Sequence, residues 1–150
     1  MRALGVDYGD RRIGLALSDA TGMLARPWKM VPRIGNPSQV ARALVDEIEA
    51  LERADEPVGV IVVGLPRRLG GEATEQTSRV QGLVGELGRL TALPVVLQDE
   101  RLSSHEADQM LARREKDWRK RKAALDAMSA AVILQDYLDS RSRQVEDGIR

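Results

Sequence analysis

Three carboxylates occupy positions where an α/β protein could gather them for chemistry. Asp7 ends the apolar run of residues 4–6, Glu100 follows the run of residues 95–97, and Asp126 lies near the start of the last apolar segment. Burying an unpaired carboxylate is costly, so such an acid needs a hydrogen-bond donor or a cation. The chain has no cysteine and one histidine, so oxygen ligands would favour a hard ion, Mg²⁺ or Mn²⁺. Such ions beside a phosphodiester suggest two-metal hydrolysis.

A purely structural role competes with this interpretation at every acid. Acids at strand ends also serve as turn formers and helix caps, and the chain has 23 acidic residues. For Asp10, in a tight turn, and for Asp19 we favour the structural role. For Asp7 and Glu100 the residues alone favour neither the functional nor the structural role. Asp126 is the weakest candidate by itself, because acids are common in the first turn of a helix.

A second candidate feature is the segment Gly-Leu-Pro-Arg-Arg at residues 64–68, after a continuous apolar run. Gly64 would permit close approach of a phosphate, and the loop's amide groups could receive it. Arg67, Arg68 and Arg101 would supply phosphate-binding donors around the same edge. The alternative is a simple strand exit with a proline turn.

The charge is unevenly distributed although the formal net charge is zero. Residues 113–122, which include Arg119 and Lys120, carry seven basic and two acidic side chains. Residues 46–56 carry six acids against one arginine. A neutral total can therefore hide one basic and one acidic face, the basic one suited to nucleic acid. Two solvated helix ends explain the same charges equally well.

The elements that must position these residues follow from hydrophobic periodicity and from turn residues. The pattern predicts strands at residues 4–6, 13–17, 23–31 (broken by Pro27), 58–63 and 94–97, and helices at residues 36–54, 80–90, from 103 and 123–138. This order is typical of an α/β domain with an antiparallel hairpin edge and parallel central strands. Ligands gather at the carboxyl ends of the strands in such sheets.

Composition sets outer bounds on the protein. Its 150 residues, 43% hydrophobic and 31% charged, are typical of one globular domain. We assign residues 1–139 to that domain and residues 140–150 to a polar, frayed tail. No run approaches the ~20 apolar residues of a membrane span, so we expect no membrane partner. Disulfides are excluded, no signal-peptide pattern is present, and a cytoplasmic location is expected by default.

Four motifs in order resemble the YqgF/RuvX family, whose members are described as Holliday-junction-resolvase-like or as pre-16S rRNA nucleases. They are Val-Asp-Tyr-Gly through Arg-Ile-Gly at residues 6–14, Val-Val-Gly-Leu-Pro at 62–66, Asp-Glu-Arg-Leu-Ser-Ser with Glu-Ala at 99–107, and Asp-Ala-Met-Ser-Ala-Ala-Val-Ile-Leu at 126–134. Each motif alone is weak, but the four in order are highly specific. Ser103 stands where threonine is common, and Ala127 where serine is usual.

The resemblance implies an RNase H-like fold, with a five-stranded mixed sheet flanked by helices. It implies that Asp7, Glu100 and Asp126 bind Mg²⁺ or Mn²⁺ and carry out catalysis. The function implied is metal-dependent hydrolysis of structured nucleic acid, foremost 5′-end processing of pre-16S rRNA in ribosome biogenesis. The expected substrate-binding residues are Gly64, Arg67, Arg68, Arg101, Ser103, Arg119 and Lys120.

Other functions stay open at this point. Junction DNA is the alternative substrate to pre-rRNA, and a resolvase acting on it would require a dimer to cut two strands symmetrically. A non-catalytic, RNA-binding ribosome-assembly factor is a rival from another class. An actin-like phosphotransferase is nearly discarded, because that superfamily needs two lobes. The expected partners are nucleic acid and ribosomal precursor particles, with the chain a monomer or weak homodimer.

Overall fold

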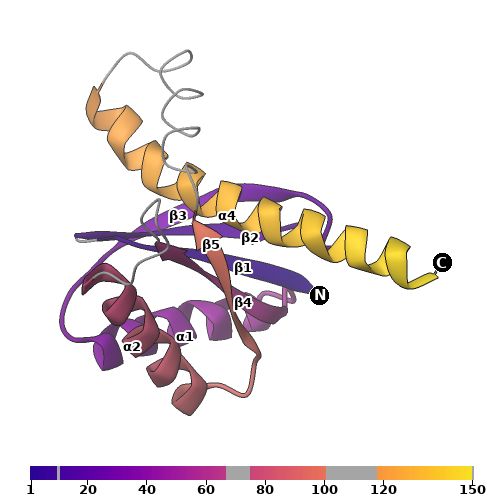
Figure 1. Cartoon of the computed structure of the whole chain (residues 1–150). Coiled ribbons are helices and arrows are strands. Elements are labelled where there is room, and N and C mark those ends of the chain that lie inside the picture. The colour runs from indigo at the N-terminus through magenta and orange to yellow at the C-terminus, as the bar shows by residue number, and fades with distance from the viewer. Residues whose placement is uncertain (10, 67–74, 101–117, 150) are drawn as a thin grey trace.

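A five-stranded mixed sheet forms the centre of the molecule in the computed structural model, which describes residues 1–9, 11–66, 75–100 and 118–149 (Figure 1). The strands are β1 (Arg2–Tyr8), β2 (Arg12–Ser18), β3 (Ala25–Pro32), β4 (Val58–Pro66) and β5 (Val95–Glu100). Their order in the sheet is β3-β2-β1-β4-β5. Pairs β1–β2 and β2–β3 are antiparallel, and pairs β1–β4 and β4–β5 are parallel. The predicted mixed sheet is confirmed.

The turn between β1 and β2 explains the glycine that follows Tyr8. The Gly9 backbone N–H donates a hydrogen bond to the Arg12 carbonyl at 3.0 Å. A Cβ at Gly9 would lie 2.6 Å from that same oxygen, so only glycine fits. The predicted hairpin is therefore confirmed, whereas Asp10 lies outside the described residues.

Helices α1 (Pro37–Arg53) and α2 (Glu75–Leu90) cover one face of the sheet (Figure 1). Asn36 caps α1: its side chain accepts from the Gln39 N–H at 2.9 Å, and the Gln39 side chain accepts from the Asn36 N–H at 2.8 Å. This reciprocal capping box confirms the predicted start of α1. The larger apolar core lies between these helices and the strand residues Leu4, Val6 and Tyr8.

Helix α4 (Trp118–Ile149) covers the opposite face (Figure 1). It begins five residues before the expected start at residue 123 and continues through the tail that we expected to fray. The tail contains no proline and its first glycine is Gly148, so nothing in its sequence stops a helix earlier. Arginine, glutamine and glutamate in it are good helix formers.

Two strands are longer or more regular than the pattern predicted. Strand β5 continues through Asp99 and Glu100, which we expected to follow the strand, because they pair in parallel with Leu65 and Pro66 of β4. Strand β3 is continuous through Pro27, and the register shifts at the β2 residues opposite, between Leu15 and Ala16. An edge strand with such an irregularity tolerates a residue that has no N–H.

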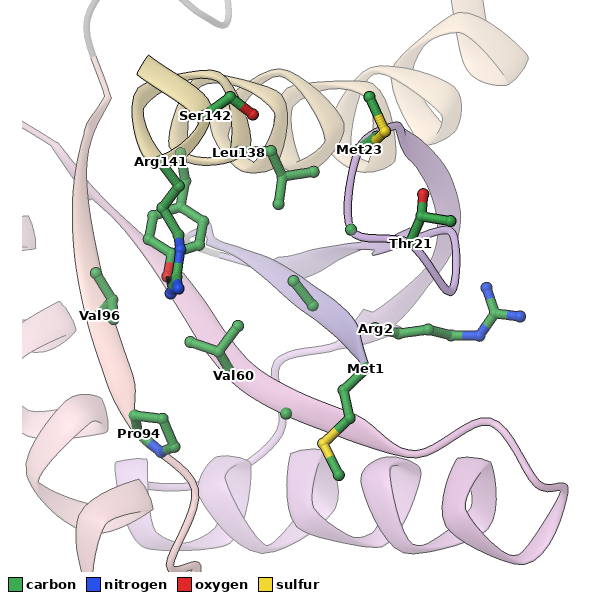
Figure 2. Close-up of a pocket in the computed structure, with 14 residues that line it drawn as sticks. Met1, Arg2, Thr21, Met23, Val60, Pro94, Val96, Leu138, Arg141 and Ser142 are labelled. Carbon is green, nitrogen blue, oxygen red and sulfur yellow. Dashed lines mark hydrogen bonds between the residues drawn. The ribbon is translucent and has the colours of Figure 1, made fainter. Parts of the chain in front are cut away.

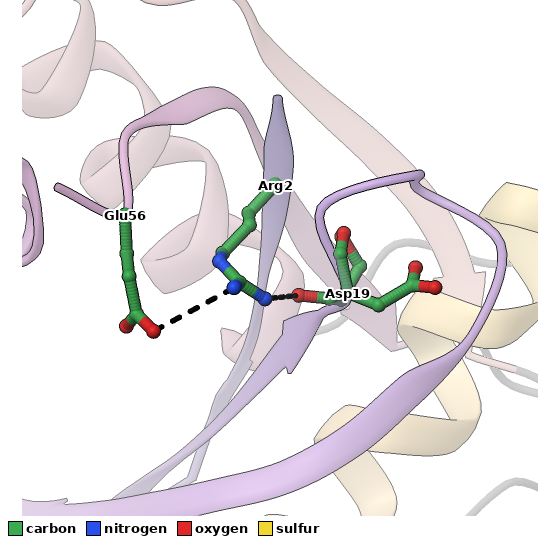
Figure 3. Close-up of polar contacts among 4 residues, drawn as sticks. Arg2, Asp19 and Glu56 are labelled. Carbon is green, nitrogen blue, oxygen red and sulfur yellow. Dashed lines mark hydrogen bonds and ion pairs between the residues drawn. The ribbon is translucent and has the colours of Figure 1, made fainter.

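Polar contacts tie the start of β1 to the end of β2 and to the segment before β4 (Figure 3). The Arg2 guanidinium donates to the Ser18 carbonyl at 3.0 Å and forms an ion pair with Glu56 at 3.5 Å. The buried Ser18 hydroxyl accepts from the Ala3 N–H at 2.8 Å. These contacts join β1, β2 and the segment that leads into β4.

Within the part of the chain that the structure describes, none of the helices combines the length and the apolar character of a membrane span.

Candidate functional site at the carboxyl edge of the sheet

Asp7 lies near the carboxyl end of β1 and is partly buried. Successive strand residues point to opposite faces of a sheet. Leu4, Val6 and Tyr8 pack in the core beneath α1 and α2, whereas Ala3 packs in the second apolar cluster with residues of α4. Asp7 therefore belongs to the face that α4 covers.

The same alternation places Gly64 and Glu100 on the α4 face. In β4, Val63 and Leu65 pack toward α1 and α2, which leaves Gly64 on the other side. In β5, Val96 packs with the α4 cluster, and Glu100 is four residues further along the same face. Parallel pairing joins Val6 with Val63 and Pro66 with Glu100, so Asp7, Gly64 and Glu100 belong to neighbouring strand ends at one edge.

Helix α4 runs antiparallel to β1 on this face (Figure 1). Ala3 packs in the cluster that contains Tyr137. Two residues later, a Cβ at Gly5 would lie 2.8 Å from Leu134 Cβ and 3.0 Å from the Ala130 carbonyl oxygen. Thus α4 passes very close to β1, and its amino-terminal part leads toward the strand's carboxyl end. Asp126 belongs to that part of α4.

The remaining expected substrate-binding residues are described only in part. Arg67, Arg68, Arg101 and Ser103 lie outside the described residues, as do the helix expected from residue 103 and residues 113–117 of the basic stretch. Arg119 and Lys120 belong to the first turn of α4. Residues 118–122 of the basic stretch are helical, whereas the pattern placed the start of the last helix at residue 123.

The sequence pattern did not indicate one polar residue at this edge. Gln98 pairs with Gly64 in the β4–β5 register and shares the α4 face with Glu100. The signal was the two-residue period that starts from Val96, but the expected strand ended at residue 97. The other acid of this segment, Asp99, points to the opposite face by the same alternation.

Asp19 has the structural role that we favoured for it. Its carboxylate accepts hydrogen bonds from the Thr21 hydroxyl at 2.6 Å and from the backbone N–H groups of Met23 and Leu24 at 2.9 and 3.2 Å. These bonds, the Thr21 bond foremost, lower the pKa of Asp19 from 3.8 to about 2. The residue organises the turn between β2 and β3 at the opposite end of the sheet from Asp7.

The three expected metal ligands have the chemistry that a hard cation requires. Asp7, Glu100 and Asp126 would offer only carboxylate oxygens, the ligands that Mg²⁺ and Mn²⁺ prefer. For Glu100 and Asp126 the structure describes the backbone alone. Among the side chains that are described, no group of three acids or histidines could hold an ion.

A pocket of about 700 Å³ lies away from these acids, near the start of β1 (Figure 2). Apolar side chains dominate its lining, among them Ala3, Val60, Val96 and Leu138. Arg141 also lines it and donates to the Tyr137 hydroxyl at 2.9 Å. That contact raises the pKa of Arg141 above its usual value. The pocket is therefore separate from the edge where the candidate acids lie.

Known relatives match almost the whole chain. The RuvX family, described as "Holliday junction resolvase", matches residues 1–140. Two bacterial relatives are named "Putative pre-16S rRNA nuclease". The one from Pelotomaculum thermopropionicum is 38% identical over 143 residues, 95% of this chain and 90% of the relative. The one from Maridesulfovibrio salexigens is 39% identical over 138 residues, 92% of this chain and 98% of the relative.

The solved structure of Thermus thermophilus RuvC in complex with a Holliday junction substrate has the same fold. The TM-score is 0.56 and the sequence identity 18%, with 95% of this chain and 96% of the RuvC chain covered. At this identity the likeness establishes the fold alone. The RNase H-like architecture expected from the sequence motifs is thereby confirmed.

Proposed function

Because this chain belongs to the RuvX family, we propose that it is a divalent-metal-dependent nuclease that processes the 5′ end of pre-16S rRNA. The family membership supports a hydrolase that acts on nucleic acid. The observation that carries the site is the convergence of β1, β4 and β5, which are parallel neighbours, at one edge and one face of the sheet. We include a cytoplasmic location, because the relatives are bacterial proteins and bacterial ribosomes are assembled there.

The path of α4 supports Asp126 as the third acid. From Gly5, which contacts α4 at Ala130, Asp7 is two residues further along β1, a step of about 7 Å. From Ala130, Asp126 is four residues back along α4, a step of about 6 Å. The two elements are antiparallel, so both steps lead in the same direction. The backbone paths therefore favour Asp7 and Asp126 as neighbours.

In this proposal Asp7, Glu100 and Asp126 hold the metal ion or ions. A bound divalent ion supplies positive charge that stabilises the transition state and lowers the pKa of a coordinated water. The protein's own part is to position the three carboxylates and to hold the flanking phosphates. Gly64 leaves room beside Asp7 for a phosphate, and Arg67, Arg68, Arg101, Ser103, Arg119 and Lys120 provide the surrounding donors.

The decisive experiment compares Asp7→Asn with wild type on end-labelled pre-16S rRNA and on four-way DNA junctions, with Mg²⁺ or Mn²⁺. Asn keeps the shape but weakens metal binding, so we expect cleavage to fall by at least about 100-fold. The melting temperature should stay unchanged, or rise slightly as carboxylate repulsion in the metal-free protein is relieved. Asp46→Asn is the matched control, because Asp46 is an exposed aspartate of α1.

Wild-type cleavage by purified Asp7→Asn would refute the nuclease site as proposed. Junction cleavage by a dimer, with pre-rRNA left intact, would replace the rRNA substrate with junction DNA. That alternative is favoured by the family description, "Holliday junction resolvase". RNA binding without metal-dependent cleavage of either substrate would identify a ribosome-assembly factor instead. We expect a monomer or a weak homodimer.

A further inference from the structure

Two arginines that the sequence analysis did not assign lie at the same edge as Asp7. Arg11 belongs to the turn between β1 and β2, and Arg33 directly follows β3. The acids of residues 46–56 belong to the second half of α1 and to the segment after it, and Glu56 pairs with Arg2 at the start of β1. These acids therefore lead toward the end of the sheet opposite to the two arginines.

A backbone hydrogen bond joins the two arginines, and a ring contact holds the Arg33 side chain. The Arg33 N–H donates to the Arg11 carbonyl at 2.9 Å, so the turn and the end of β3 are joined. The Arg33 guanidinium lies 5.1 Å from the centre of the Tyr8 ring, within the range of a cation–π contact. Tyr8 is only 3% exposed and follows Asp7 directly. The Arg33 side chain is thus already restrained beside the end of β1, so binding a phosphate would cost little side-chain entropy.

We propose that Arg11 and Arg33 bind phosphates of the nucleic acid on the hairpin side of the site. This inference rests on the proposed nuclease function. Tyr8 and Asp7 point to opposite faces, so Arg33 lies on the other side of β1 from Asp7. It therefore contacts a phosphate beside the reacting one. The nucleic acid backbone crosses the carboxyl edge of the sheet, with these arginines on one side and the first turn of α4, which carries Arg119 and Lys120, on the other.

The test measures binding of a labelled four-way DNA junction without divalent ions, in EDTA, across a range of salt concentrations. Each phosphate contact contributes about 0.9 to the slope of log K against log salt. The double variant Arg11→Gln, Arg33→Gln should lower the slope by about 1.8. The ratio of the wild-type association constant to that of the variant should therefore fall about tenfold between 50 and 200 mM salt. Arg26→Gln, an exposed arginine near the other end of β3, should leave the slope unchanged.

Two further variants separate charge from packing. Arg11 is exposed, so Arg11→Gln alone should fold normally and lower the slope by about 0.9. Arg33→Lys keeps the charge and should keep the slope. In cleavage assays the double variant should raise KM with little change in kcat, because a flanking contact acts on binding.

The outcomes distinguish this inference from the proposed function. If wild type cleaves but Arg11→Gln and a folded double variant keep the wild-type slope, the phosphate site is wrong and the nuclease stands. If the slopes fall as expected but wild type cleaves nothing, the phosphate site stands and the nuclease is wrong. No binding of the junction by wild type at 50 mM salt would overturn the phosphate site, whereas the cleavage assay on pre-16S rRNA decides the nuclease separately.

Discussion

Gly5 lies where α4 passes closest to β1, and it offers a sharp test of how that helix is held. A Cβ there would approach Leu134 Cβ to 2.8 Å and the Ala130 carbonyl oxygen to 3.0 Å. Both atoms belong to or adjoin the helix backbone, so rotation of a flexible side chain cannot relieve the contact. The variant Gly5→Ala must push α4 away from the sheet.

The magnitude follows from two opposing effects. Overpacking a well-packed core costs about 1–3 kcal/mol. Alanine in a strand returns about 0.5–1 kcal/mol relative to glycine, because the unfolded chain has less freedom to lose. The net loss in the free energy of unfolding is therefore about 1 kcal/mol, within a range of about 0–2.5 kcal/mol, equivalent to a fall of about 3 °C in the melting temperature of a 150-residue domain.

The matched control is Gly85→Ala on the exposed side of α2, where a Cβ would meet nothing within 4 Å. The same substitution there should stabilise the protein by about 1 kcal/mol through helix propensity. Thermal unfolding followed by circular dichroism measures both. Cleavage by Gly5→Ala should also fall at temperatures where it is fully folded, because α4 carries Asp126. A rise in melting temperature for Gly5→Ala would refute the close packing of α4 on β1.

Three more outcomes are expected. Ser18→Ala leaves the buried Ala3 N–H without its acceptor and should lower the free energy of unfolding by about 1–3 kcal/mol in urea titrations, with an unchanged m-value. Asp19→Asn should destabilise the protein near neutral pH. The pKa of Asp19 is lowered to about 2, so its stabilising contribution is complete above pH 3.8 and is lost as the pH falls through 2. The melting temperatures of wild type and Asp19→Asn should therefore converge near pH 2. A difference in melting temperature that stays constant with pH would contradict this expectation. Neutralising four basic residues of 113–122 should weaken binding of RNA and DNA of all sequences and flatten its salt dependence without changing metal affinity; equal binding at every salt concentration would make this stretch a solvated connector.

The sequence determined the sheet, the two helices beneath it and the structural role of Asp19. Alternating or continuous apolar runs bounded by glycine, proline and asparagine set these elements locally, and residues 36–39 alone encode the capping box at the start of α1. Four ordered motifs indicated the family and hence the RNase H-like fold. They also named Asp7, Glu100 and Asp126 as candidates, although these residues are far apart in the chain.

Tertiary contacts decided what local patterns could not. Strand β5 runs on through Glu100 because β4 offers a partner for it, and pairing between strands leaves no trace in the β5 sequence itself. Helix α4 lies directly against β1 because Gly5 has no side chain, a complementarity between residues more than 120 positions apart. Arg33 reaches Tyr8 only because β2 and β3 fold back on β1, which brings the end of one strand to the end of another. Sequence periodicity assigns a residue to a face of its strand or helix. Only the assembled sheet decides which residues from other segments lie next to it on that face.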